Sequence, residues 1–485
     1  MIAALAVAAA LLSAPDTLVV GTLADPVTLD PHRATDLAAA AIVSNVCETL
    51  VRWRPDGSRP EPALATTWAT TDGRRWTFTL RSGVRFHDGA PLDADAVVAN
   101  LEAITRTRGL AAHAERIGPF VVGITLDQPN AALLATLSQP FFSLVSPRAL
   151  SADRPTAIGT GPFVLASARP GLVELRANPD YWGGAPRLAR VTFQRAPDAA
   201  TLARRLIEGE VDLSTALSET ELRRLRGRPD TALDMRTGLN IAFLSVNNER
   251  SPWRDRRVRQ ALARAIDRPA LVQEALGGQG EPARNPLPPS LWGYATRTRE
   301  LMLDRIVSRR LLREAGYGEG VETTLLAVDA PRPYNPAPMR VAERVVADLA
   351  EVGIRARMRQ VSTWAEFLDK ATRGDYDLAV MGWQADTTDP NDFLSALLAS
   401  DAVGTTNRSR YRSPAMDGLL RQGRRTDNLR ERTAIYREAQ TLFQRDMPWV
   451  PLYHVSVSTA YRRSLRGLAV GPTGLSRFDK VWKTQ

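Results

Sequence analysis

Residues 374–393 read GDYDLAVMGWQADTTDPNDF, a short apolar run followed by a loop rich in carboxylates. The apolar run, residues 378–381, is too short for a helix and lies between a turn-forming Gly-Asp pair and Gly382. This pattern predicts a buried strand. In α/β sheets functional groups commonly follow the carboxyl ends of such strands, and here Trp383 and Asp386 do so. We therefore expect an aromatic face and a carboxylate together at one edge of a sheet.

The carboxylates of this loop have more than one interpretation. Asp386, Asp389 and Asp392 are spaced three residues apart. As isolated residues they are typical of turns and of solvated loops. A calcium loop of the EF-hand type is disfavoured, because the alternating Asp/Asn, the Gly and the final Glu are missing.

Length and charge limit the class of protein. A chain of 485 residues exceeds what one hydrophobic core usually supports, so two or more lobes are expected. Its 44% apolar and 24% charged residues are typical of a globular protein. The net charge is +10, but basic and acidic residues are mixed along the chain, which argues against a nucleic-acid partner.

The amino end predicts export. Residues 1–12 are apolar and residues 13–15 read Ser-Ala-Pro, so residues 1–15 are interpreted as a signal peptide. No Lys or Arg precedes the apolar run, which indicates a start inside a longer signal; an uncleaved anchor is the alternative. Cys47 lies far beyond this segment, so it is expected to be a core thiol and not a lipid-attachment site.

Several motifs resemble a known family. The pattern Gly-Trp-x-x-Asp-x-x-Asp-Pro at 382–390 resembles a segment of the family 5 extracellular solute-binding proteins, the peptide and nickel receptors of ABC importers. Residues 53–105 are similar to the family's signature region, and Gly-Thr-Gly-Pro-Phe at 159–163 and Asn-Pro-Asp-Tyr-Trp-Gly-Gly at 178–184 are similar to its fold markers. The similarity runs from about residue 17 to the end of the chain.

The resemblance implies a zwitterion site. In peptide-binding members the Asp that matches Asp386 binds the ligand's α-ammonium group. Arg-Pro-Tyr-Asn-Pro at 332–336 resembles the dipeptide-binding branch, in which the Arg matching Arg332 binds the ligand's carboxylate. A guanidinium suits this role because its fork makes two charge-assisted hydrogen bonds to one carboxylate. Without the resemblance, Arg332 would be interpreted as a surface residue in a proline-rich loop.

Further ligand contacts follow from the same resemblance. Backbone groups of Gly382 and Gln384 are expected to pair with the peptide as with an added strand, and Trp383 to cover a ligand side chain. Weaker candidates lie in the loop after the strand predicted at 17–22. The remaining predicted contacts are Tyr334, Asp25 and Val27.

The expected architecture is α/β: a two-lobed periplasmic-binding-protein clamshell of the three-domain, cluster C type, with a hinge between the lobes. Lobe 1 would hold domain I (16–43, 158–243 and 453–485) and domain II (44–157). Lobe 2 would be domain III (244–452). One departure from the dipeptide branch is the missing cysteine pair after Ala399.

The expected function is capture of dipeptides or short oligopeptides for an ABC importer. The protein would be a periplasmic monomer without cofactor or metal site, delivering its ligand to permease subunits through peripheral contact with the membrane complex. Alternatives of the same fold are receptors for a nickel chelate, haem, glutathione or an antimicrobial peptide. The other alternative is a peptide hydrolase, for which no catalytic motif is present in the sequence. The four histidines are widely scattered, which disfavours direct metal binding: His32, His87, His113 and His454.

Overall fold

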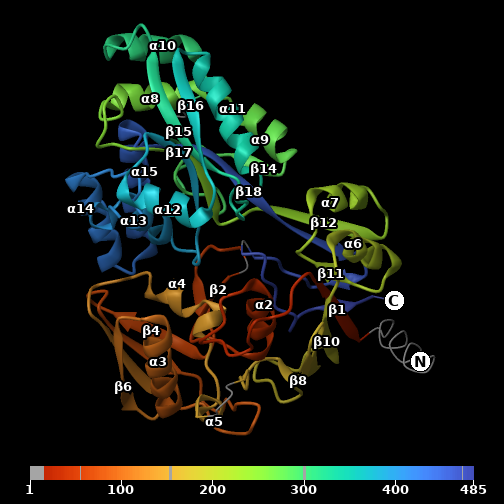
Figure 1. Ribbon diagram of the computed structural model, residues 1–485. Coiled ribbons are helices and arrows are strands. Elements are labelled where there is room, and N and C mark those ends of the chain that lie inside the picture. Colours follow the sequence, from red (N-terminus) through yellow and green to blue (C-terminus); the bar gives the residue numbers. More distant parts are fainter. Residues whose placement is uncertain (1–15, 55, 152–155, 299–301, 472, 485) are drawn as a thin grey trace. The chain divides into compact units, whose positions relative to one another are not determined.

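The computed structural model describes residues 16–54, 56–151, 156–298, 302–471 and 473–484 (Figure 1). The predicted signal peptide lies outside these residues. The chain forms two compact units: the first comprises the residues up to Arg236 and those from Val457 onward, and the second comprises Thr237–Ser456. Strands and helices alternate along both units, so the fold is α/β, as predicted. The division into domains I, II and III remains a prediction.

The main sheet of the first unit is built around β1, where the sequence predicts a strand. In spatial order its strands are β8 (Phe163–Arg169), β9 (Leu172–Ala177), β10 (Arg190–Arg195), β1 (Thr17–Thr22) and β11 (Leu213–Ser214). β1 is parallel to both of its neighbours. Leu18 and Val20 belong to one buried cluster and Val19 to another, so both faces of β1 are covered.

A second, antiparallel sheet in the first unit has its own core. In spatial order its strands are β4 (Ala65–Thr70), β5 (Arg75–Leu80), β7 (Val121–Leu126) and β6 (Ala112–Gly118). Helix α3 (Ala94–Arg108) is capped by Asp93, whose side chain accepts the N–H of Ala96. Val97, Leu101 and Ile104 of this helix are buried in the cluster of this sheet.

The first unit contains several further elements. They are α2 (Leu37–Val46), β2 (Val51–Trp53), β3 (Pro60–Pro62), α4 (Leu133–Leu137), η1 (Pro140–Phe142), α5 (Pro147–Leu150), α6 (Ala199–Glu208), α7 (Glu219–Leu225), β12 (Thr231–Thr237), β19 (Leu465–Arg466) and β20 (Trp482–Lys483). Helix α6 ends at Gly209, which adopts the left-handed conformation expected of a glycine at this position.

A buried carboxylate connects the family's fold markers within the first unit. The Glu48 side chain accepts hydrogen bonds from Thr160 Oγ1 at 2.9 Å, Tyr181 OH at 2.8 Å and Trp182 Nε1 at 2.7 Å. Arg477 forms an ion pair with it at 3.2 Å. A buried carboxylate requires partners of this kind. The Gly-Thr-Gly-Pro segment and the aromatic turn therefore stabilise the fold.

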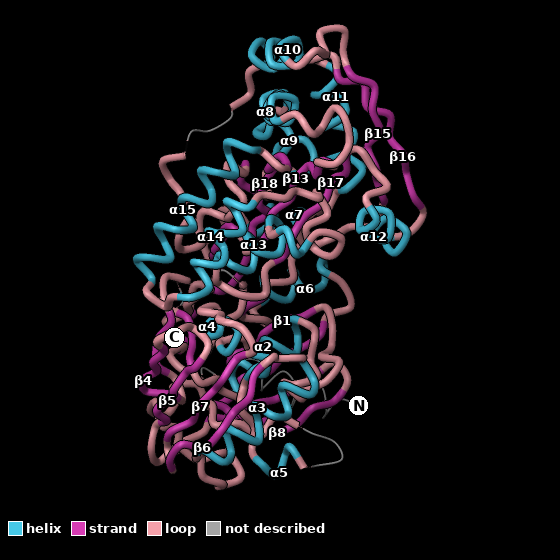
Figure 2. Tube along the Cα trace, turned by 90° about the vertical axis from the view of Figure 1, so that its left-hand side faces the viewer, coloured by secondary structure: helices cyan, strands magenta, loops and turns pink. Residues whose placement is uncertain are grey.

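The second unit is built on a mixed sheet. In spatial order its strands are β16 (Ile354–Val361), β15 (Val321–Val328), β17 (Leu378–Gln384), β13 (Asn240–Val246) and β18 (Trp449–Arg462), with β14 (Gly280–Pro282) paired to β18. β16, β15 and β17 are parallel to one another, whereas β13 is antiparallel to both of its neighbours. Figure 2 shows β15 and β16 side by side.

Helices cover this sheet. They are α8 (Arg256–Ala265), α9 (Arg268–Leu276), α10 (Arg305–Glu314), α11 (Pro338–Ala350), α12 (Trp364–Arg373), α13 (Pro390–Leu398), η2 (Ser400–Ala402), α14 (Pro414–Arg425) and α15 (Leu429–Asp446). Helix α11 contacts β15 and β16 and ends at Ala350. At the start of α12 the hydroxyl of Thr363 accepts the N–H of Glu366 at 3.1 Å, as in a capping box.

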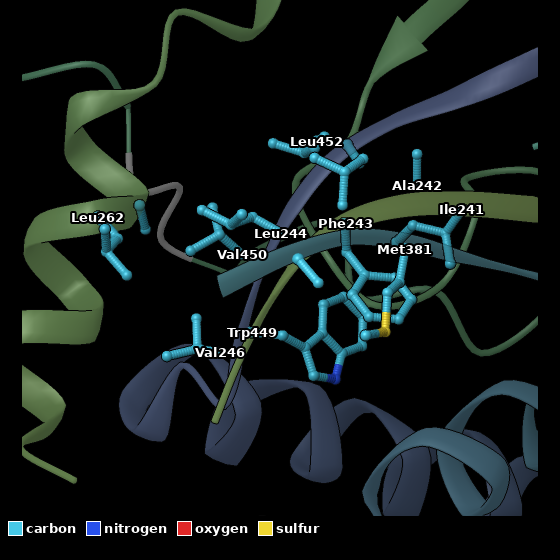
Figure 3. Packing of buried hydrophobic residues seen from close by; sticks show 14 of the residues in the cluster. Ile241, Ala242, Phe243, Leu244, Val246, Leu262, Met381, Trp449, Val450 and Leu452 are labelled. Atoms are coloured by element: carbon cyan, nitrogen blue, oxygen red, sulfur yellow. The ribbon is translucent and has the colours of Figure 1, made fainter. Parts of the chain in front are cut away.

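The core of the second unit includes the centre of this sheet (Figure 3). All residues of β13 are buried. The ring of Trp449 lies 4.4 Å from that of Phe243 and 4.5 Å from that of Phe443, measured between centroids. Aromatic contacts of this kind add to the stabilisation from burial. They fix β13, and β13 in turn fixes the strand beside it, β17.

Strand β17 is longer than the apolar run alone predicts. The sequence predicts a strand at 378–381, whereas β17 extends over Leu378–Gln384. β13 pairs with its whole length, and Ile241 lies opposite Trp383. Trp383 is therefore inside the strand and not beyond its end. Of its two neighbours, β15 is parallel to β17 and β13 is antiparallel.

Candidate functional site

Arg332 and Asp386, the two residues predicted to hold a zwitterion, follow neighbouring strands of the second unit. Arg332 lies in the loop after β15, and Asp386 lies in the loop after β17. These strands pair in parallel. The carboxyl ends of parallel neighbours lie at the same edge of a sheet, where α/β proteins commonly bind ligands.

Arg332 is positioned by its own loop and by Trp364. The backbone N–H groups of Arg332 and Asn335 donate to each other's carbonyl oxygens at 2.9 and 2.8 Å, which closes the turn. The guanidinium carbon of Arg332 lies 4.1 Å from the centre of the Trp364 ring, a cation–π distance. Its Nε is buried and has no hydrogen-bond partner within the part of the chain that the structure describes. This guanidinium is oriented and its Nε is free to donate, a state suited to an incoming anion.

Tyr334 of the same loop packs against β17 at Gly382. A Cβ at position 382 would lie 2.2 Å from Tyr334 Cδ2 and 2.6 Å from the carbonyl oxygen of Ile241, so only glycine fits. Burial raises the pKa of Tyr334, and the positive charges of Arg332 and Arg408 lower it by less. The hydroxyl is thus protonated at neutral pH and can donate a hydrogen bond.

The edge of β17 that faces away from β13 has backbone groups that β15 does not pair with. The N–H of Ala385 donates to Leu239 O at 2.8 Å, and hydrogen bonds alternate in direction along an antiparallel strand. The N–H and C=O groups of Gly382 and Gln384 therefore point away from β13. On that side β15 pairs only with the first two residues of β17, and no other described strand pairs there. An extended chain can add to such an edge.

A single carboxylate shapes the turn after β17. Asp392 Oδ2 accepts the backbone N–H groups of Asp386 and Thr387, both at 3.0 Å. Its Oδ1 accepts the indole N–H of Trp383 at 3.3 Å. Asp392 is thus a positioning residue, and the turn that it stabilises leaves the side chain of Asp386 exposed.

Two carboxyl groups, those of Asp386 and Asp392, lie close together at this turn. Burial raises the pKa of Asp392 to about 6, and the nearby Asp386 also raises it, against hydrogen bonds from Thr387 and Trp383 that lower it. Two carboxyl groups that oppose each other's ionisation favour a cation between or beside them. An ammonium group at this turn would therefore be stabilised.

Asp389 has a structural role. It accepts the N–H of Asn391 at 2.9 Å as the N-cap of α13. It also forms a two-pronged ion pair with Arg432 at 2.7 and 2.9 Å, with only 1% and 5% of the two side chains exposed. Burial alone would lower the pKa of Arg432, but Asp389 and Tyr436 hold it above its ordinary value. This pair anchors the end of the loop that carries Asp386.

Two of the weaker candidates lie in the first unit. Asp25 Oδ1 accepts the N–H of Gly171 at 2.9 Å, and Oδ2 forms an ion pair with Arg195 at 3.3 Å. Val27 is 82% exposed. The Asp25 carboxylate therefore has partners in its own unit. Its contact with a ligand, and that of Val27, remain predictions.

Two of the histidines and the cysteine occupy buried positions. His32 and His454 are buried, with ring nitrogens 3.0 Å from Ser143 O and 2.7 Å from Asn240 O, and burial lowers the pKa of each, that of His454 to about 4. Cys47 is a buried free thiol whose pKa is raised by burial. Among the described residues no group of three or more His, Cys, Asp or Glu is arranged to hold a metal ion.

Comparison with known proteins assigns the family. Residues 59–405 match the sequence model for the middle region of the bacterial extracellular solute-binding proteins, family 5. The chain belongs to this family. Within the described part of this solute-binding protein, no helix has both the length and the apolar character needed to cross a membrane.

Relatives of this solute-binding protein cover nearly its whole length. Heme-binding protein A of Haemophilus influenzae is 30% identical over 473 residues, with 90% of this chain and 86% of the relative covered. Di/tripeptide-binding protein 1 of Pseudomonas aeruginosa is 29% identical over 497 residues, with 94% and 92% covered. The solved structure of HbpA2 from Haemophilus parasuis matches with a TM-score of 0.92 at 28% identity, covering 97% of this chain and 100% of that one.

Removing Asp389 tests the anchor of the loop. Asp389→Ala leaves Arg432 buried without its partner and removes the cap of α13, so we expect the free energy of unfolding to fall by about 3–5 kcal/mol. Urea denaturation followed by circular dichroism measures this change. Asp369→Ala is the control, because Asp369 pairs with Arg373 while 54% of its side chain is exposed. It should cost below about 1 kcal/mol, and an equal loss in both variants would contradict the anchoring role.

Proposed function

We propose that this solute-binding protein is the receptor of an ABC importer that captures dipeptides or short oligopeptides through their charged ends. The observation that carries the proposal is the joint presence of three features in the second unit. They are an acidic turn at Asp386, an unsatisfied guanidinium at Arg332 and an open strand edge at Gly382 and Gln384. The similarity to a di/tripeptide-binding protein supports it.

The charges match the two ends of a free peptide. Asp386, with Asp392 behind it, would bind the α-ammonium group, and Arg332 would bind the α-carboxylate. A ligand enclosed by the protein loses its water, so each charged end must be paired or several kcal/mol per ion is lost. Pairing both ends makes the receptor specific for unmodified short peptides.

The strand edge would read the peptide backbone. Gly382 and Gln384 direct their N–H and C=O groups outward and can pair with an extended ligand whatever its side chains. The indole of Trp383, held by Asp392, would cover a ligand side chain. Tyr334 packs on Gly382 and borders the same edge.

The same proposal includes the compartment and the partners of the receptor. After removal of the signal peptide the protein would act in the periplasm as a monomer and would deliver its ligand to permease subunits, contacting the membrane complex only peripherally. Its role is binding and release, without catalysis. Hinge closure around the ligand would mark the loaded state for the permease.

A haem receptor is the second candidate. The similarity to Heme-binding protein A and to HbpA2 favours it. Haem lacks an α-ammonium group, so its binding would not depend on Asp386. Competition between haem and a dipeptide for the refolded chain distinguishes the two.

Charge removal tests the peptide proposal. Each of Asp386→Ala and Arg332→Ala leaves one end of the ligand unpaired, so dipeptide affinity should fall by at least about a hundredfold. Isothermal titration of the refolded chain, freed of copurified ligand, measures it. Asp401→Ala and Arg373→Ala remove exposed charges of the second unit and should change affinity by less than about twofold. A loss below about tenfold in either site variant contradicts its assignment.

The acidic turn predicts a pH dependence. A bound ammonium group favours ionised Asp392 and lowers its pKa from the value near 6 in the free protein. Binding then releases a proton, so affinity rises as pH rises through about 6 and falls by about tenfold between pH 7 and pH 5. Asp392→Asn should flatten this profile, whereas Asp401→Asn should retain it. A wild-type profile flat from pH 7 to pH 5 contradicts the coupling.

A further inference from the structure

A second arginine, Arg408, lies beside the predicted carboxylate site. It lines a cavity of about 30 Å³ together with Tyr334, Trp364 and Gly382. Arg332 lines a second cavity of about 10 Å³, also with Tyr334 and Trp364. The two cavities thus share these aromatic side chains, and both lie within the second unit. Arg332 and Arg408 are therefore both close to Tyr334.

Arg408 has no acidic partner among the described residues. Its Nε donates to Thr372 Oγ1 at 3.3 Å, a neutral contact. By contrast, the nearby Arg410 and Arg412 both pair with Glu249. Burial lowers the pKa of Arg408, and the groups that oppose this are the hydroxyls of Tyr334 and Tyr376. A half-buried guanidinium without a counter-charge destabilises the free protein, which a ligand anion would relieve.

Arg332 and Arg408 act on the same hydroxyl group. The positive charges of both lower the pKa of Tyr334, although burial raises it by more. The protonated hydroxyl adds a neutral donor close to two charged donors. One carboxylate satisfies one such fork well, so the pair exceeds the need of a single ligand carboxylate.

We propose that this receptor selects peptides with a second carboxylate, that is, dipeptides with an acidic side chain. The terminal carboxylate would bind Arg332 and the side-chain carboxylate would bind Arg408, with Tyr334 donating between them. This inference rests on the proposed function and adds a substrate class to it. A neutral dipeptide would still bind through its two ends but would leave Arg408 unpaired.

Matched peptides test the selection. Isothermal titration compares Ala-Glu with Ala-Gln, and Glu-Ala with Gln-Ala, in which an amide replaces the carboxylate at nearly constant shape. We expect at least one acidic peptide to bind about tenfold tighter than its amide partner. Affinities within about threefold in both pairs would overturn the inference and would indicate that both arginines hold one terminal carboxylate. This comparison uses the unmodified chain, so no variant needs to fold.

A variant then assigns the preference to its residue. Arg408→Gln should abolish the preference for the acidic peptide while leaving affinity for its amide partner within about threefold. Arg412→Gln is the matched control, since 57% of the Arg412 side chain is exposed, and it should keep the preference. A preference that survives in folded Arg408→Gln would overturn the assignment.

Different results would contradict the selection of acidic peptides and the peptide receptor itself. If Ala-Gln binds and Asp386→Ala abolishes that binding, but acidic peptides gain nothing, only the acidic selection is wrong. If none of the four peptides binds, both the peptide receptor and the acidic selection are wrong.

Discussion

The antiparallel pairing of β17 with β13 determines where the groups of the candidate site lie. It extends β17 through Trp383 and turns the backbone groups of Gly382 and Gln384 outward. It also brings Gly382 against Ile241, which leaves room for Tyr334 only because position 382 lacks a side chain. Since β13 is fully buried among aromatic side chains, this arrangement has little freedom to change. The groups of the candidate site thus lie beside a fully buried strand of the second unit.

Two loops of the second unit carry the charged groups of the candidate site. The loop after β17 contains two carboxyl groups, and Asp386 opposes the ionisation of Asp392. The loop after β15 contains Arg332, whose Nε has no hydrogen-bond partner among the described residues. An opposite charge brought to either loop would be stabilised. Asp389 pairs with Arg432 and anchors the end of this loop, whereas Asp392 holds the turn through backbone N–H groups. These two similarly spaced aspartates therefore have different structural roles.

Local signals in the sequence predicted those parts of the structure that depend on neighbouring residues. The strand predicted at 17–22 is one such part, and β1 occupies the same residues. The full length of β17 was not predicted, because it depends on pairing with β13, which lies far away in the sequence. For the same reason no local pattern indicated that Asp389 pairs with Arg432, 43 positions away.

In the candidate site too, local motifs were predicted and contacts between distant residues were not. Family motifs identified Arg332 and Asp386, whereas the role of Asp392 appears only from its hydrogen bonds. Arg408 carries no motif, and its lack of an acidic partner becomes visible only in the folded chain. Buried charges and their partners are properties of tertiary structure, so sequence patterns do not reveal them.

The most direct measurement of charge-end recognition is titration of the refolded chain with one dipeptide in four forms: free, N-acetylated, C-amidated and doubly capped. Recognition of both ends predicts micromolar or tighter binding of the free form and loss of binding when either end is capped, because each cap removes one of the two charges. Equal binding of free and capped forms would contradict the account, since the peptide would then be held without Asp386 and Arg332.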